Sequence, residues 1–349
     1  MGERPLRQLA ERIDRIGDNC HDGRALRVAI LHEIGRNVAF DAYAWLLTDP
    51  ETEVGSDPLA DVPCLSELPQ LIRLKYSTEQ NRWTRLANTA GRLQADTSGE
   101  PDRSLVWREL LRGYNVSDIA SVVFRDRFGC WGFLDLWRIG GPHFTDPETE
   151  YLATIAPRVT DRLRGLQART FLARAPLNLP EGAAVLVLAP DLQVRAQTAQ
   201  TEAYLRALVP PDGDRQPVPA GAYNVGAQLI ASEAGVDNHP ARARVHLKDR
   251  GWLSLRAARM AGPRGNPTDI AVTIETASVV ERMGVFTRAY GLSLREAELL
   301  AALAGGSDSK QLAAQLYISE NTVQDHLKSI FAKTGARNRR VLMARVLGS

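Results

Sequence analysis

Four polar residues near the C-terminus are spaced to share one face of a helix: Asn321, Gln324, Asp325 and Lys328. Three apolar residues of the same stretch fall on another face: Val323, Leu327 and Ile330. Amide, carboxylate and ammonium groups on one exposed face are what base edges and phosphates in a DNA major groove require. A solvated surface helix has the same pattern, so the neighbouring elements must decide between the two.

Two shorter helices are predicted immediately before this one. Ser293 and Glu296 have the spacing of a capping box at the start of the first helix. The second spans about Asp308 to Leu316, and Ser319 caps the third, Glu320 to about Lys333. Two short helices, a tight turn and a polar third helix favour a helix-turn-helix that binds double-stranded DNA.

Four segments of this region resemble the LuxR-type helix-turn-helix family: Leu294-Arg-Glu-Ala-Glu298, Leu312-Ala-Ala-Gln-Leu-Tyr-Ile-Ser319, Asn321-Thr-Val-Gln-Asp-His-Leu-Lys328 and Ile330-Phe-Ala-Lys-Thr-Gly-Ala-Arg337. The resemblance covers residues 292–349 without a gap. It implies an all-α, four-helix DNA-binding domain whose fourth helix spans about Asn338 to Leu347.

The resemblance also suggests roles for individual positions. The residues expected to face the bases are Asn321, Gln324, Asp325 and Lys328. Those expected to contact phosphates are Ser319, Thr322, Lys333, Arg337 and Arg339. The family often has lysine or arginine where this chain has Gln324. Glutamine prefers adenine and aspartate accepts from cytosine, so this departure leaves the operator sequence open.

Charge is unevenly distributed along the chain. The whole chain has a net charge of +2, whereas the segment from Thr287 to Ser349 has nine basic and five acidic residues. A basic module on a slightly acidic body indicates a polyanion partner at the C-terminus.

The first part of the chain is predicted to be α+β. Residues 1–19 are expected to form an N-terminal helix and residues 20–170 a first domain. Within it we expect a helix over Ala25–Asn37 and a strand over Ala42–Leu47. A short helix is expected over Leu105–Arg112, and the runs Ile119–Phe124 and Cys130–Trp137 indicate a hairpin. Phe144-Thr-Asp-Pro-Glu148 begins a closing helix that extends to about Leu166. This layout resembles a GAF domain, a module for small-molecule sensing or dimerisation.

A proline-containing stretch near 168–181 divides this domain from a second α+β domain, residues 181–278. Residues 183–195 read as strand, turn and strand, followed by a helix over Gln197–Leu208. Two further strands, Gly251–Met260 and Asp269–Glu275, are joined by a Gly- and Pro-rich turn over 261–267. The layout resembles a PAS domain. Residues 279–291 are a connector to the DNA-binding domain.

Several classes of protein are disfavoured. No run approaches the ~18 apolar residues of a membrane span, and the N-terminus lacks a signal-peptide core, so we expect a cytoplasmic protein. Three cysteines without CxxC spacing and no HExxH argue against a metal site, and no cofactor is expected. Neither a P-loop nor a receiver-domain pattern is present. No nucleophile–base constellation supports an enzyme.

The sequence therefore predicts a homodimeric transcription regulator. A ligand or partner bound to the N-terminal body would set the spacing of two recognition helices, with RNA polymerase as a further partner. The candidate dimer surfaces are the closing helix (Leu152–Leu166), the connector and the fourth DNA-binding helix. Four tryptophans either line a sensor pocket or fill the core: Trp83, Trp107, Trp131 and Trp137. The alternative is a protein-interaction adaptor tethered to DNA, without a small-molecule effector.

Overall fold

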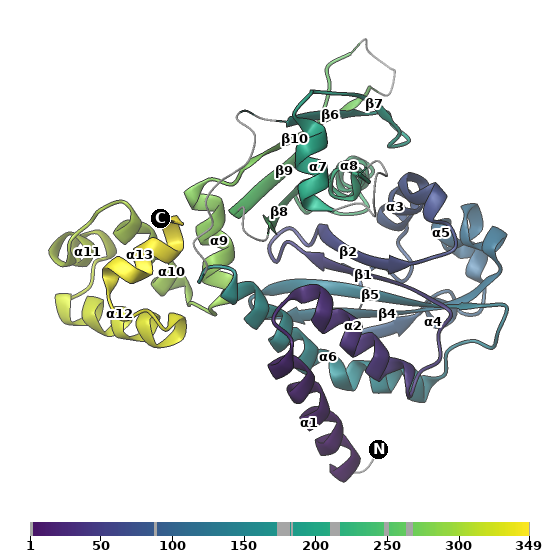
Figure 1. Cartoon of the computed structure of the whole chain (residues 1–349), viewed down its shortest axis with the longest axis horizontal. Coiled ribbons are helices and arrows are strands. Elements are labelled where there is room, and N and C mark those ends of the chain that lie inside the picture. Colours follow the sequence, from purple (N-terminus) through teal and green to yellow (C-terminus); the bar gives the residue numbers. More distant parts are fainter. Residues whose placement is uncertain are drawn as a thin grey trace.

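Two antiparallel sheets and a helical C-terminal domain make up the chain (Figure 1). The computed structural model describes residues 3–86, 89–172, 182, 184–209, 217–247, 251–262 and 268–348, without the side chains of residues 3–8. Most of the expected break at 168–181 and most of the turn at 261–267 lie outside these residues. Within the described part, no helix is long and apolar enough to cross a membrane.

The first sheet has the order β2-β1-β5-β4-β3. Its strands are β1 (Ala42–Thr48), β2 (Gly55–Asp61), β3 (Ala90–Arg92), β4 (Val116–Asp126) and β5 (Gly129–Ile139). The predicted hairpin is confirmed by β4 and β5, whose register pairs Val122 with Leu134. Both strands are almost entirely buried because helices cover both faces of the sheet.

One face of this sheet packs against α1 (Glu3–Asn19), α2 (Gly23–Gly35) and α6 (Asp146–Arg169). The predicted closing helix is confirmed as α6, which begins with a capping box between Thr145 and Glu148. Its apolar residues, including Ile155 and Val159, are buried in this core. The sequence suggests this helix as a candidate dimer surface, but its apolar face packs against the chain's own sheet.

The other face is covered by α3 (Leu68–Ser77), α4 (Leu93–Asp96) and α5 (Leu105–Glu109). The helix expected over Leu105–Arg112 is shorter, because Leu110 leaves helical geometry with φ −139° and a 3-10 turn follows at Leu111–Tyr114. Strands β2 and β3 and helices α3 and α4 were not predicted.

The second sheet has the order β7-β6-β10-β9-β8, the same topology as the first. Its strands are β6 (Ala184–Leu188), β7 (Val194–Gln197), β8 (Arg242–Leu247), β9 (Gly251–Arg259) and β10 (Ile270–Thr276). The two strands expected within 183–195 correspond to β6 and β7, and those expected on either side of 261–267 to β9 and β10; each two are paired. The helix expected from Gln197 begins only at Thr201 as α7 (Thr201–Leu208), because Gln197 pairs with Leu186 in the sheet.

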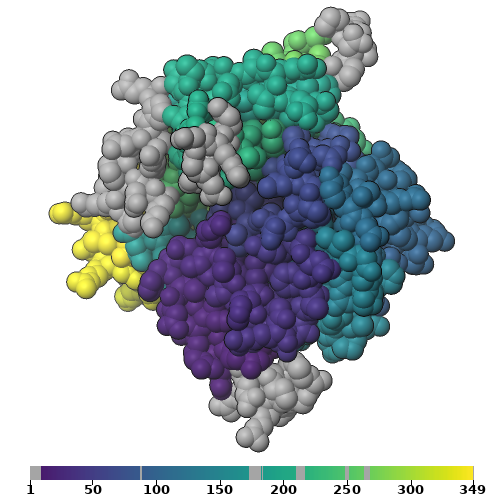
Figure 2. All heavy atoms as spheres, turned by 45° about the vertical axis from the view of Figure 1, so that its right-hand side comes forward, coloured from purple at the N-terminus to yellow at the C-terminus, as the bar shows by residue number. Residues whose placement is uncertain are grey.

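Helix α8 (Ala220–Glu233), absent from the sequence prediction, joins the two sheets. It packs against α3 and β2 on one side and β9 on the other. Its first nine residues are buried, since it is apolar around most of its circumference. A Cβ on Gly226 would come within 3.0 Å of Leu192, so glycine allows this close packing. The second hydrophobic core accordingly combines Trp83 and Phe133 of the first lobe with residues of the second. In the space-filling view the teal and green lobe lies directly on the purple and blue one (Figure 2).

The C-terminal part consists of α9 (Val279–Ala289), α10 (Leu294–Ala304), α11 (Ser309–Leu316), α12 (Glu320–Thr334) and α13 (Arg339–Leu347). The expected connector is thus a helix, α9, which packs against α6, α10 and α13. The four helices after it agree with the predicted boundaries.

Candidate nucleic-acid interface

Glu296 fixes the first helix of the C-terminal domain to the third. Its carboxylate closes the capping box of α10 by accepting from the Ser293 N–H at 2.6 Å. It also accepts from Ser329 Oγ and Lys333 Nζ of α12, each at 2.6 Å. Burial alone would raise the pKa of Glu296, but these bonds outweigh it and lower the pKa to about 2. The carboxylate is therefore ionised and holds α12 at a fixed angle.

The turn between α11 and α12 aims the third helix. Asp308 caps α11 through the N–H of Gln311, and Tyr317 ends the helix with φ +54°. Ser319 then accepts from the N–H of Thr322 at 3.1 Å and caps α12. Leu312 of α11 is buried together with the predicted apolar face of α12: Val323, Leu327 and Ile330.

The polar face of α12 points to solvent. Asn321, Gln324, Asp325 and Lys328 are all exposed. Within this face, Lys328 Nζ lies 3.5 Å from Asp325, and Gln324 donates to Ser309 at 3.3 Å. Helices α11 and α12 lie at the outer end of the molecule, whereas α9 faces the sheets (Figure 1). The body therefore does not cover the four side chains in this arrangement.

The five predicted phosphate contacts are not equivalent. Ser319 and Thr322 lie at the N-terminus of α12, where the helix dipole favours an anion. Arg337 is exposed. Lys333 is in the ion pair with Glu296, and Arg339 donates to Ser309 at 2.5 Å. Sequence spacing did not reveal the role of Lys333, because its partner lies on another helix.

Three exposed cations of the same domain were not among the predicted contacts, and one of them, Arg295, is in an ion pair with Glu298. Lys310 is in the first turn of α11 and Arg340 in the first turn of α13. The excess of basic residues in this segment was the only sequence feature that pointed to them, and a net charge does not assign a phosphate contact to a particular residue.

The C-terminal domain is attached to the body through α9. Arg282 donates to the carbonyl oxygens of Leu347 at 3.0 Å and Arg345 at 3.3 Å, both at the end of α13. On the other side, Arg288 donates to the Phe128 carbonyl at 2.8 Å and the Tyr290 hydroxyl to the Ala168 carbonyl at 2.9 Å. The position of helices α10 to α13 is thus linked to the loop of the first hairpin and the end of α6.

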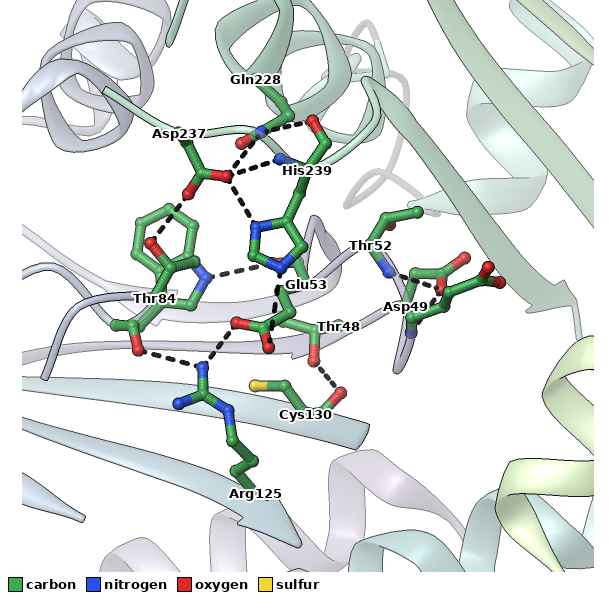
Figure 3. Close-up of polar contacts among 12 residues, drawn as sticks. Thr48, Asp49, Thr52, Glu53, Thr84, Arg125, Cys130, Gln228, Asp237 and His239 are labelled. Carbon is green, nitrogen blue, oxygen red and sulfur yellow. Dashed lines mark hydrogen bonds and ion pairs between the residues drawn. The ribbon is translucent and has the colours of Figure 1, made fainter. Parts of the chain in front are cut away.

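Polar groups join the two lobes, where Asp237 and His239 of the second meet Thr84 and Glu53 of the first (Figure 3). Asp49, after β1, binds Arg244 of β8, and Arg244 donates to the Glu281 carbonyl of α9 at 3.1 Å. Beside this pair, His239 Nδ1 lies 2.6 Å from Asp237 and its Nε2 lies 3.9 Å from Glu53. The hydrogen bond to Asp237 raises the pKa of His239, and this effect outweighs burial, which would lower it.

A cavity of about 380 Å³ lies between the first sheet and helices α3, α5 and α8. Of the four tryptophans, only Trp137 lines it. Trp83 stacks on Phe133, Trp131 is in the core, and Trp107 donates to the Val116 carbonyl. Three of the four tryptophans are thus structural, and Trp137 shares the cavity wall with residues of other types.

Comparison with known proteins supports the C-terminal assignment. Residues 291–346 match the GerE family, described as bacterial regulatory proteins, luxR family. A probable transcriptional regulatory protein, SgaR of Hyphomicrobium methylovorum, is 51% identical over 53 residues, which are 15% of this chain and 25% of that protein. The transcriptional regulatory protein LnrK of Bacillus subtilis (strain 168) is 44% identical over 48 residues, 14% of this chain and 22% of that protein. The chain therefore matches about a quarter of these relatives' length, and residues 291–346 form a luxR-family domain.

A solved structure of Escherichia coli SdiA aligns with 98% of this chain and 97% of its own, at 12% identity and a TM-score of 0.35. A TM-score this low does not indicate a common fold.

Proposed function

We propose that this protein is a sequence-specific, DNA-binding transcription regulator that acts as a homodimer in the cytoplasm. The exposed polar face of α12, held by the Glu296 contacts within a luxR-family domain, is the observation on which this proposal rests. Asn321, Gln324, Asp325 and Lys328 are the proposed base-reading residues. Gln324 would prefer adenine and Asp325 would accept from cytosine.

A backbone-contact set is proposed beside them: Ser319, Thr322, Lys333, Arg337 and Arg339. Because Lys333 is paired with Glu296, it acts mainly on the position of α12. The exposed guanidinium of Arg337 is therefore more available to a DNA phosphate than the ammonium of Lys333. Double-stranded DNA is the proposed partner of the domain, and RNA polymerase a further one.

For the N-terminal body, we propose a GAF-like domain over residues 20–170 and a PAS-like domain over residues 181–278. Two antiparallel sheets with helices packed on them support this division. The shared core around α8 means that the two domains act as one body upon α9. Residues 292–349 then form the DNA-binding domain, linked by the 279–291 connector.

A sensing role is favoured over the adaptor alternative by the cavity. A filled core would have favoured the adaptor, whereas about 380 Å³ of space is within the usual range of small-molecule sites, about 300–1,000 Å³.

Dimerisation is proposed because two recognition helices about 34 Å apart are needed to bind successive turns of DNA. With the apolar face of α6 buried, α9 and α13 remain from the predicted surfaces. Val280 of α9 is 72% exposed.

The testing experiment selects DNA fragments with the full-length protein and compares the selected site with a scrambled one. We expect Gln324→Ala and Lys328→Ala to reduce the preference for the selected site. Arg195→Ala is the matched control, since Arg195 is an exposed cation on β7, far from α12. Equal affinity of the unaltered protein for selected and scrambled DNA would contradict the proposal.

A further inference from the structure

The cavity between the two lobes is mostly apolar but contains polar groups without partners. Its apolar wall includes Leu46 and Phe133 of the sheet and Leu71 and Ile72 of α3. Leu65 and Val218, which also line it, are exposed, so the cavity opens to the surface on that side. Its volume, about 380 Å³, suits a compact organic molecule.

Asn224 of α8 lines this cavity and is 1% exposed. Neither Nδ2 nor Oδ1 of its side chain has a hydrogen-bond partner. A buried primary amide without partners is unfavourable, because it has lost its hydrogen bonds to water and no protein group replaces them. Native structures keep such groups mainly where a ligand or water satisfies them.

A second unsatisfied donor is found in the same wall. Trp137 is 2% exposed, and its indole Nε1 has no partner. The hydroxyl of Tyr76 accepts from the Gly55 N–H at 2.9 Å, which leaves its own proton to donate. The wall therefore offers three kinds of donor and, through the Asn224 carbonyl, one acceptor.

The charged groups of the cavity interior neutralise each other. Lys75 Nζ lies 2.8 Å from Asp135 Oδ2, and both side chains are largely buried. Asp135 also accepts from Ser121 Oγ, so its second oxygen is occupied. Arg24 lines the cavity but is exposed, where water screens its charge. No described residue inside offers an unpaired charge to an ion.

We propose that this cavity binds a compact, uncharged and largely apolar molecule that carries an amide or lactam group. An N–H and a carbonyl side by side would complement the carboxamide of Asn224, which offers one acceptor and one donor in the same plane. A further acceptor on the molecule would take the Trp137 or Tyr76 hydrogen. A carboxylate is disfavoured, because it would leave water without an unpaired cation to receive it.

Contacts to both lobes would make this ligand regulatory, a conclusion that rests on the proposed function. Four wall residues belong to the second lobe, and the rest of the wall to the first: Val209, Val218, Ala220 and Asn224. A bound molecule would therefore hold α8 against α3. The same lobes meet at Asp49 and Arg244, next to α9.

The test measures binding of 2-quinolinone, 2-piperidone and benzamide to the full-length protein without DNA, by ligand-observed NMR and thermal melting. Quinoline, an acceptor without the N–H, is the matched probe. We expect the three amides to bind and quinoline to bind at least tenfold more weakly. Asn224→Leu should weaken amide binding about tenfold or more, whereas Ser232→Ala, an exposed change on the same helix, should not.

A second variant keeps Asn224 but fills the space. Ala44→Phe, at a half-buried wall position of β1, should abolish binding while the protein still melts cooperatively. Asn224→Leu should also raise the melting temperature of the free protein, because it removes an unsatisfied amide. A clear fall in melting temperature would overturn the proposal, since it would show that the amide already has a structural partner.

Failure of all three amides to bind the unaltered protein would likewise overturn it, as would equal binding by Asn224→Leu. Selection of DNA by the same preparation is measured separately. Loss of probe binding with intact DNA selection contradicts only this inference. Probe binding without DNA selection contradicts the proposed function instead.

Discussion

Arg244 forms two hydrogen bonds to the carboxylate of Asp49, with Nε 2.7 Å from Oδ2 and Nη2 2.6 Å from Oδ1. Both side chains are buried, and they join the two lobes. Burial alone would raise the pKa of Asp49, but the bonds to Arg244 outweigh it and lower the pKa. Because Arg244 also donates to the Glu281 carbonyl, the pair connects the lobe interface to α9 and, through Arg282, to the DNA-binding domain.

Removing the Asp49 charge should destabilise the protein strongly. Asp49→Asn leaves the Arg244 guanidinium buried with only Glu51 as a charged partner, at 2.7 Å. We expect a loss of about 3 kcal/mol in the free energy of unfolding, measured by urea denaturation. Glu202→Gln, which breaks the exposed pair of Glu202 with Arg206, should cost under about 0.5 kcal/mol. Equal effects of the two changes would show that the buried pair contributes no more than a surface pair.

The Glu296 cluster predicts a pH-dependent stability. With the pKa lowered to about 2 from 4.5, its stabilisation is complete above about pH 4.5 and is lost as the pH falls toward 2. Glu296→Gln should therefore lower the free energy of unfolding by about 3 kcal/mol at pH 7 and very little near pH 2. Denaturant titrations at several pH values measure this difference. Glu298→Gln, on the same helix but in an exposed pair, is the control, and a pH-independent deficit in Glu296→Gln would contradict the assignment.

Arg337 and Lys333 should differ in their contribution to DNA binding. Arg337 is exposed, so Arg337→Ala should weaken binding to all sequences and reduce the slope of log K against log salt by about 0.9. The charge of Lys333 is used by Glu296, so Lys333→Ala should change the slope less while lowering stability. Affinity measured across a salt series, with unfolding measured in parallel, separates the two. If Lys333→Ala also reduced the slope of log K against log salt by about 0.9, the ion pair of Lys333 with Glu296 would have to break when the protein binds DNA.

His239 should make the lobe interface sensitive to pH in the opposite sense. Its pKa is raised above 6.5, chiefly by the hydrogen bond to Asp237, with Glu53 adding to the effect and Arg125 opposing it. The stabilisation from the protonated ring is complete below about pH 6.5 and is lost as the pH rises through the folded-state pKa. The melting temperature of His239→Gln should therefore lie furthest below that of the unaltered protein at low pH. An NMR titration of the ring that gives a pKa at or below 6.5 would refute this.

The sequence was sufficient for the C-terminal domain because its determinants are local. Each helix begins at a cap that is visible in the chain, such as Ser293, Asp308 or Ser319, and its apolar residues repeat at helical spacing. The same holds for the β4–β5 hairpin and the start of α6. These elements are specified by residues a few positions apart, so their bounds followed without knowledge of the fold.

Helix α8 shows what local patterns miss. Its small and apolar residues are buried between two sheets, so it lacks the polar face by which an amphipathic helix is recognised. The sequence also could not predict that the side-chain amide of Asn224 lacks hydrogen-bond partners, because this depends on which distant groups the fold places around it.

The sequence by itself determined the DNA-binding module, its helices and the polar face of α12, since these depend on short-range spacing and capping. Only the tertiary structure decided that Lys333 pairs with Glu296, that Asp49 meets Arg244 across 195 positions, and that α8 leaves a cavity beside Asn224. The physical reason is that ion pairs, unsatisfied polar groups and cavities are properties of packing between distant segments. Such packing is fixed by the whole core rather than by neighbouring residues along the chain.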